Sequence, residues 1–519
     1  MHHQNLTPVA PQERIQTIDI LRAFALFGVV IANFTVDNSN VSPGSGRRGF
    51  LDQLAYWPIR FFIDDKAMAM YCFLFGLGFS IQMMRAEARK ANYVFLHLRR
   101  MIALFIIGII AFILTWETIP HEYAMVGLLL LLFYKIPWKL LPILALLCIA
   151  VPFTKYLIDT KKATQEANKI KAVTIDDSLL DACTGVYERE NEAGRYNVIT
   201  REGNRIFNLG RGGKFPLITQ SSTEFVVPNS MDKYSFIKDS SGETTKLIIQ
   251  PANRPALNCV KIKKGIKEAQ EEMYKQMLRP PPPPRDTTTY KQFVVRNSKN
   301  VLDRFKNWSW SDFFWGFDIS GILSFFLIGL YAGRRKIFYN VTGNGSFLKK
   351  VMWGGFVLGV SGMSIRLGLE IWQLITHIQQ GVYFSATERA WFQFAWDFGV
   401  LSMTFAYVAG ITLLLEKEDW KKRLSFLAPV GRMGFTNYLL HVIPYVIIFH
   451  YGFNLTGRVG PFYRLLMALP VYVALIFLSR WWFKHFAIGP AEWLWRSMTY
   501  LKFQPMRLKE PDKKEKPTE

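Results

Sequence analysis

The sequence lacks the short motifs by which many enzymes are recognised. Its 519 residues contain no spacing typical of metal ligands, no phosphate-binding loop and no nucleophile motif, so we expect no metal site. Cysteine is also scarce. Cys72 and Cys148 fall in apolar runs and are interpreted as packing residues, whereas Cys183 and Cys259 are either bridged or two unrelated thiols. Any chemistry must therefore depend on other polar groups of the chain.

Long apolar runs, in contrast, recur along most of the chain. The mean hydropathy of +0.11 averages two populations, because residues 159–307 are polar and most of the remainder is apolar. A bilayer core of about 30 Å requires about 20 apolar residues per helix. Runs of this kind span 18–36, 67–84, 101–116, 122–134, 140–158, 313–333, 351–372, 393–415, 435–449 and 462–480. We therefore predict an all-α polytopic membrane bundle of about ten helices.

The net charge of +23 is distributed as a membrane-topology signal and not as a nucleic-acid-binding surface. Lys and Arg concentrate in alternate short loops, as at 85–100 and 334–350, and in the C-terminal tail, while the loops between them carry few. Under the positive-inside rule this asymmetry predicts that both termini are cytoplasmic. We expect a bacterial inner-membrane location, membrane lipid as a partner and no nucleic acid. The sequence indicates no particular oligomeric state.

Residues 159–307 follow five predicted helices and are therefore expected on the outer face. Alternating stretches around a Glu202-Gly-Asn turn, and others from Tyr234 to Ile249, predict about six short strands between 180 and 260. A charged helix over 261–278 and five prolines at 280–284 then form a spacer back to the membrane. The expected organisation is membrane helices in 1–158, an extracytoplasmic β-rich domain with its helix and spacer in 159–284, membrane helices in 285–500 and a charged cytoplasmic tail in 501–519.

Three segments together resemble one family. The first runs from Arg14 to Asn33 and is followed by Phe73-Leu-Phe-Gly-Leu-Gly-Phe. The others are Pro429-Val-Gly-Arg-Met-Gly-Phe-Thr-Asn-Tyr-Leu-Leu and Gly489-Pro-Ala-Glu-Trp-Leu-Trp-Arg-Ser-Met-Thr-Tyr. This combination resembles the YeiB-like bacterial inner-membrane proteins, whose C-terminal half is catalogued as a domain of unknown function. Residues 180–250 are similar to a small β-domain that often follows serine-hydrolase domains, which brings no activity of its own.

The opening Asp19-x-Leu-Arg motif is also similar to that of membrane acyltransferases, including the heparan-glucosaminide acetyltransferase type. This resemblance implies acyl transfer from a cytoplasmic thioester, with acyl-CoA as the candidate donor, to an outer-face sugar or lipid. The heparan-glucosaminide type has an asparagine at the position of Asn33 and a catalytic histidine in the following loop. Residues 34–66 of this chain contain no histidine, so the catalytic base lies elsewhere or is absent.

Ionisable and amide side chains inside apolar runs are costly in lipid, so each is a candidate site residue. The candidate catalytic residues are Asn33 as an oxyanion donor, with His121 or His441 as the base. The candidate substrate-binding residues are Asp19, Arg22, Arg366, Glu370, Asp397 and Asn437. Structural interpretations stay open for these residues. The pairs Asp19–Arg22 and Arg366–Glu370 can form local ion pairs on a helix, and a lone helix histidine is often a packing residue.

The candidates that fall in the outer half of the membrane are expected to converge on one cavity open to the outer face: Asn33, His121, Arg366, Glu370 and Asp397. Asp19 and Arg22 would close its cytoplasmic side. The favoured function is acyl transfer onto a cell-envelope sugar, lipid or glycan. Two alternatives stay open: a transporter for a small solute, against which the lack of an internal repeat argues, and a non-catalytic envelope protein whose β-domain binds a partner.

Overall fold

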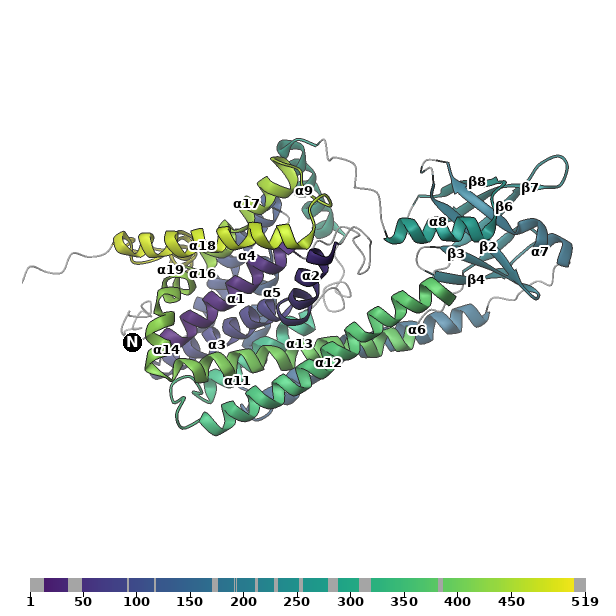
Figure 1. Ribbon diagram of the computed structural model, residues 1–519. Helices are drawn as coiled ribbons and strands as arrows, with labels where there is room; N and C mark the ends of the chain where they lie inside the picture. Colours follow the sequence, from purple (N-terminus) through teal and green to yellow (C-terminus); the bar gives the residue numbers. More distant parts are fainter. Residues whose placement is uncertain are drawn as a thin grey trace, which may run out of the picture.

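The computed structural model describes residues 14–507, except 36–48, 91–92, 116–117, 170–175, 191, 193, 211–212, 228–231, 252–254, 279–287, 308–318 and 381–385. The prolines 280–284 and most of the tail 501–519 thus lie outside the described residues. Figure 1 shows a helical bundle with the β-rich domain beyond one of its ends, whereas α14 and α19 lie at the opposite end. The long helices α6, α12 and α13 extend towards the β-rich domain (Figure 1).

The bundle is formed by helices from both sides of the inserted domain. The first group is α1 (Gln16–Thr35), α2 (Phe50–Phe62), α3 (Lys66–Ala88), α4 (Tyr93–Thr115), α5 (Pro120–Phe133) and α6 (Leu141–Lys169). The second group is α9 (Tyr290–Lys306), α11 (Ile319–Arg334), α12 (Gly345–Gln380), α13 (Ala386–Leu415), α14 (Glu418–Leu424), α15 (Ala428–Arg432), α16 (Gly434–Leu440), α17 (Val442–Val446), α18 (Pro461–His485) and α19 (Pro490–Tyr500). A 3₁₀ turn, η2 (Ser425–Leu427), and a π-helical turn, η3 (Ile447–Tyr451), complete the second group.

Seven helical segments in the described part of the chain are long and apolar enough to cross a membrane. The number becomes eight if Glu418–Arg432 and Gly434–Tyr451, which meet at 70°, form one bent span. Candidate spans of full length are therefore fewer than the predicted number of about ten, and the remaining membrane segments stay a prediction. Helices α5 and α11 are apolar but have only 14 and 16 residues, and the predicted 435–449 span is broken into α16, α17 and η3.

Glycines allow the central helices to approach closely. A Cβ at Gly76 of α3 would overlap the carbonyl group of Phe326, and one at Gly329 of α11 would overlap that of Phe73. Helices α12 and α13 pack in the same way, since a Cβ at Gly362 would lie 2.6 Å from the carbonyl oxygen of Ala395. Small residues at helix interfaces give close packing in membrane proteins. The bundle therefore has tightly joined helix pairs and little free space between them.

The inserted domain is a closed antiparallel barrel of eight strands, two more than predicted, in which each strand pairs with the next and β8 pairs with β1. Its strands are β1 (Gly185–Arg189), β2 (Tyr196–Glu202), β3 (Arg205–Gly210), β4 (Gly213–Thr219), β5 (Glu224–Val226), β6 (Lys233–Lys238), β7 (Thr244–Gln250) and β8 (Leu257–Ile262). The short β5 has few alternating residues, which made it hard to predict. The charged helix α8 (Ile266–Leu278) follows, as predicted, and packs on β1 and β2.

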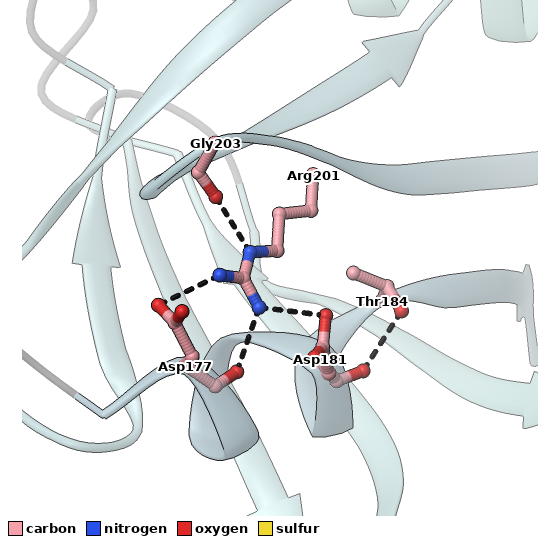
Figure 2. A network of polar contacts seen from close by, with 5 residues as sticks. All are labelled: Asp177, Asp181, Thr184, Arg201 and Gly203. Carbon is pink, nitrogen blue, oxygen red and sulfur yellow. Dashed lines mark hydrogen bonds and ion pairs between the residues drawn. The ribbon is translucent and has the colours of Figure 1, made fainter.

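An ion-pair network joins helix α7 (Asp177–Cys183) to the barrel (Figure 2). The guanidinium of Arg201 on β2 lies 2.7 Å from Asp177 Oδ1 and 2.9 Å from Asp181 Oδ1. Its Nε donates to the carbonyl of Gly203, where φ of +61° turns β2 into β3. The buried side chains of Leu180 and Cys183 on α7 join the barrel core. Arg201 therefore fixes this helix on the barrel.

The open question of a disulfide is answered within the barrel. Cys183 and Cys259 are both free and fully buried in the barrel core. Burial raises the pKa of the Cys183 thiol to about 11, so the reactive thiolate is scarce at neutral pH. The two cysteines are structural packing residues in this fold.

Candidate active site

The centre of the candidate site is a contact between the two halves of the bundle. Asn33 Nδ2, on α1, lies 2.9 Å from His441 Nε2. His441 is fully buried and Asn33 is half-buried. An amide N–H that donates to Nε2 requires a neutral imidazole whose proton is on Nδ1. The contact thus holds a basic nitrogen inside the bundle, beside an amide that has a second N–H to donate.

His441 is placed by a break in its helix. It lies between α16 and α17, and the π-helical segment η3 follows shortly afterwards. Such π-helical turns are frequent at functional sites. One turn before His441, the fully buried Asn437 donates from Nδ2 to Ser479 Oγ of α18 at 2.8 Å and to the carbonyl of Val430 at 3.2 Å. In this structure Asn437 therefore anchors the segment that carries His441.

The two C-terminal motifs fasten this segment to α19. The Glu492 carboxylate accepts from the backbone N–H groups of Phe435 and Thr436 at 2.7 and 3.2 Å, and from the Thr436 hydroxyl at 2.5 Å. Thr436 Oγ1 in turn accepts from the N–H of Ala491 at 2.9 Å. Burial raises the pKa of the Glu492 carboxyl, and the Thr436 hydrogen bonds oppose that rise. The polar groups of each motif therefore form hydrogen bonds with those of the other. These bonds explain why both motifs contain polar residues in an apolar region.

Helix α1 is held by contacts along its length. A Cβ at Gly431 would overlap the carbonyl oxygen of Asp19, so α15 lies directly on α1. The Tyr472 hydroxyl of α18 donates to the carbonyl of Ala23 at 2.9 Å. At the other end, the fully buried Arg464 donates from Nη1 to the carbonyl of Phe34, the residue that follows Asn33, at 3.4 Å. These contacts fix the end of α1 that carries Asn33.

A cavity of about 350 Å³ opens at the end of the bundle where α1 begins. Residues from α1, α3, α4, α15, α16 and α19 line it, so both halves of the bundle contribute. Its described lining contains two carboxylates, Asp19 and Glu492, and a larger set of arginines: Arg14, Arg22, Arg85, Arg89, Arg100, Arg432 and Arg496. Asp19 and Arg22 form an ion pair of 3.0 Å at this wall. The cavity therefore carries a strong excess of positive charge.

Neighbouring arginines in this wall repel one another. Burial, followed by the charges of Arg14 and Arg100, lowers the pKa of Arg496 to about 10. Arg100 is held by Gln82 Oε1 at 2.6 Å and lies 4.1 Å above the Trp495 ring. An anion in the cavity would relieve this repulsion and accept several charge-assisted hydrogen bonds.

The inner end of the cavity reaches the neighbourhood of His441. Tyr438 lines the cavity, and its ring centroid is 5.3 Å from that of His441. Tyr71 packs edge-on against Tyr438 at 6.2 Å, and its buried hydroxyl has no hydrogen-bond partner among the described residues. A ligand in the cavity could therefore extend from the arginines to the tyrosines that border the Asn33–His441 contact.

Among its described lining residues the cavity contains Asp19 and Arg22, but not Asn33, His121, Arg366 or Asp397. The convergence of the outer-half candidates on one cavity therefore stays a prediction. His121 is the second residue of α5 and packs against Phe112, with ring centroids 4.9 Å apart.

Arg366 and Asp397 lie on α12 and α13, two helices that approach each other closely at Gly362. Asp397 accepts a hydrogen bond from Gln393 at 2.9 Å. The side chain of Glu370 lies outside the described residues, so its pairing with Arg366 stays a prediction.

Comparisons with known proteins match the two halves of the bundle separately. The family described as heparan-alpha-glucosaminide N-acetyltransferase, catalytic, matches residues 14–168. The family described as protein of unknown function (DUF418) matches residues 332–502. The uncharacterized protein YxaH of Bacillus subtilis is 25% identical over 97% of this chain and 99% of its own length. The uncharacterized protein YeiB of Escherichia coli is 40% identical over 15% of this chain and 20% of its own length.

The chain is similar to the YeiB-like proteins in these matched regions. It is an acyltransferase-like membrane protein that contains a domain of unknown function. No solved structure matches the chain. Asn33 comes from the acetyltransferase-like region and His441 from the region of unknown function, so their contact joins the two matched regions.

Sequence reasoning missed the arginine-lined cavity and the role of Glu492. Arg22 was a candidate substrate-binding residue, whereas the loop arginines were interpreted as a topology signal, because positive-inside counting treats each loop by itself. Their pattern offered one further clue, since the cavity takes arginines from several segments and not lysines. Arginine is the residue that suits multidentate binding of phosphate or carboxylate.

Proposed function

We propose that this protein transfers an acyl group from a cytoplasmic thioester to a hydroxyl or amine of an envelope sugar or lipid. The observation that carries this proposal is the Asn33–His441 contact of 2.9 Å, which pairs a basic nitrogen with an amide donor inside the bundle. The match to an acetyltransferase catalytic family over residues 14–168 supports the same reaction class. Acyl-CoA is the proposed donor.

The proposed step needs no group beyond these two side chains and the substrates. When the substrates enter, the acceptor replaces Asn33 as the donor to the lone pair of His441 Nε2. His441 Nε2 then takes the proton of the acceptor while the acceptor oxygen or nitrogen attacks the thioester carbonyl carbon. An N–H of Asn33 donates to the oxyanion that forms on the carbonyl oxygen. When the carbon–sulfur bond breaks, the imidazolium returns its proton to the leaving thiolate. The products are the acylated acceptor and the free thiol.

The cavity supports a phosphate-bearing donor. Its arginines give an anionic ligand several bidentate partners, and its tyrosine-lined inner end borders His441. We propose that the phosphates of the donor lie among the arginines and that the acyl thioester points towards Tyr438. Arg366, Glu370 and Asp397, on the helices that extend towards the barrel, are proposed to lie on the acceptor side.

The proposed orientation follows from the same arrangement. Both termini and the cavity face the cytoplasm of a bacterial inner membrane, and the barrel lies on the outer face. The shorter helices α5 and α11 and the bent pair at α14–α17 complete a bundle of about ten membrane segments. This orientation brings a cytoplasmic donor and an outer acceptor to opposite ends of the Asn33–His441 contact.

Membrane vesicles of known sidedness test this function. Inside-out vesicles that contain the protein and radiolabelled acetyl-CoA outside should accumulate labelled acyl groups on lumenal lipid or glycan, and vesicles without the protein should not. Right-side-out vesicles should give no transfer, because coenzyme A esters do not cross the bilayer. Uptake of intact labelled solute without acylated product would instead favour a transporter and would contradict the proposal.

The Tyr71→Phe variant separates a ligand-binding role from a structural one. The variant removes a hydroxyl that has no partner among the described residues, so thermal stability should stay unchanged or rise. Acyl transfer at low donor concentration should fall about threefold to tenfold, as expected for one lost hydrogen bond. The matched control is Tyr407→Phe, whose hydroxyl donates to the Phe62 carbonyl at 2.9 Å and whose loss should lower stability but not transfer. Unchanged transfer in Tyr71→Phe would remove this residue from the donor site.

A further inference from the structure

Helix α9, which leads from the barrel domain back to the bundle, has an inner face that contacts α4. The Tyr290 hydroxyl donates to the carbonyl of Leu114 at 2.9 Å, and Asn297 Nδ2 donates to that of Ile113 at 3.3 Å. Val301 is buried on this side. The helix is well defined at its start, where Thr289 and Gln292 form a capping box. Figure 1 shows α9 at the barrel-side end of the bundle.

A second sector of α9 is apolar and exposed. Val295 is 61% exposed and Leu302 is 58% exposed, although both side chains are fully apolar. They lie one on top of the other, because residues seven apart are nearly in line on an α-helix. Around the helix axis, Val295 and Leu302 lie about 100–160° from Tyr290, Asn297 and Val301, so this sector is turned away from the α4 contact.

Basic residues border this apolar sector and extend from it to Arg296. Arg296, Lys299 and Lys306 are exposed, and the only acidic residue in the sequence of the helix is Asp303. Arg296 and Leu302 are about 120° apart around the helix axis. A helix with adjacent apolar and basic sectors is suited to lie in the plane of a membrane interface.

The surface beside α9 is itself apolar. Helix α4 is a candidate membrane span, and its exposed side chains include Ile106, Ile110 and Leu114. The exposed sector of α9 and the neighbouring helix α4 therefore both present apolar side chains that are suited to lipid. The basic sector adds charge complementarity to phosphate headgroups.

We propose that α9 lies in the headgroup region of the barrel-side leaflet and binds anionic phospholipid. Val295 and Leu302 enter the acyl-chain boundary, and Lys299, Lys306 and Arg296 contact the phosphates. This binding fixes the point at which the barrel domain joins the membrane. The inference does not depend on the acyl-transfer reaction.

Fluorescence quenching on the full chain, reconstituted in vesicles of phosphatidylcholine and phosphatidylglycerol, tests this proposal. The background is Cys148→Ser, since the other three cysteines are buried. A bimane label at Leu302→Cys should be quenched at least about threefold more by nitroxide-labelled phospholipid than the same label at Arg296→Cys, and aqueous iodide should show the reverse order. If iodide quenches both labels equally, or neither quencher reaches Leu302→Cys, α9 lies in water or under protein and the proposal is overturned.

A second measurement on the same labelled protein tests the charge. Replacement of phosphatidylglycerol by phosphatidylcholine should reduce lipid quenching at Leu302→Cys, and Lys299→Gln with Lys306→Gln should abolish this difference. The matched control is Lys349→Gln with Lys350→Gln, two exposed lysines at the start of α12, which should leave the difference intact. If lipid quenching at Leu302→Cys is the same with and without phosphatidylglycerol in every variant, the binding of anionic lipid is contradicted.

Discussion

Replacement of His441 by alanine should lower the rate of acyl transfer by about 10²–10⁴-fold, the usual contribution of a positioned general base. The reason is the loss of Nε2, the basic nitrogen that faces Asn33 at 2.9 Å. Asn33→Ala should cost about 10²–10³-fold, as for the loss of one oxyanion donor. Neither residue is among the described residues that line the cavity, so coenzyme A binding should change little. Single-turnover transfer in inside-out vesicles measures the rate.

Two further variants exclude a simple loss of packing. His441→Gln keeps polar side-chain atoms at the buried position but has no basic nitrogen, and it should be as inactive as His441→Ala. The exposed His485 at the end of α18 provides the matched control, since His485→Ala should transfer at the normal rate. Full activity in His441→Gln at normal expression would rule out histidine as the base. His121→Ala would then be the next variant to measure.

Removal of two cavity arginines should weaken coenzyme A binding by about 10²–10⁴-fold, because each lost hydrogen bond to a charged group costs about 1.5–3 kcal/mol. The suitable pair is Arg14→Gln with Arg496→Gln. Both residues line the cavity, and the charge of Arg14 lowers the pKa of Arg496, so the two positive charges repel each other in the free protein. Their loss should therefore leave stability unchanged or raise it. Calorimetric titration with coenzyme A measures the affinity.

The control for this pair changes the same amount of charge elsewhere. Lys422→Gln with Arg423→Gln removes two exposed charges from the short helix α14, at the same end of the bundle. This control should keep normal affinity at moderate salt. If both double variants lose affinity equally, general electrostatic attraction would explain the binding, and the cavity would not be the donor site. A fall in stability of the Arg14–Arg496 variant would show that these arginines are structural.

Much of the fold could be predicted because segments in lipid must be apolar and segments in water are mostly polar, which gives simple patterns in the sequence. The apolar runs located the long helices of the bundle, and the polar insertion located the β-rich domain. They did not locate the amphipathic or short helices α2, α9, α14, α15 and α19. The full barrel was harder to predict, since closure depends on the pairing of β8 with β1 and no local pattern encodes it. The predicted 435–449 run is broken around His441, which no apolar pattern indicates.

The candidate site was predictable residue by residue but not as an arrangement. Asn33 and His441 were both singled out as polar groups in apolar helices, yet 408 positions separate them and only tertiary packing brings them together. The sequence could group candidate residues only by their expected depth in the membrane. Depth groups Asn33 with Arg366 and Asp397, and none of the three is among the described residues that line the arginine-rich cavity.

A density map of the protein with a non-reactive analogue of acetyl-CoA, in which a methylene replaces the thioester sulfur, tests the central claim most directly. The account predicts that the phosphates lie among Arg14, Arg22 and Arg496, and that the acyl carbonyl passes Tyr438 to lie within hydrogen-bond distance of Asn33 and beside His441 Nε2. Density for the analogue at any other surface, or with its acyl group turned away from the Asn33–His441 contact, would contradict the account.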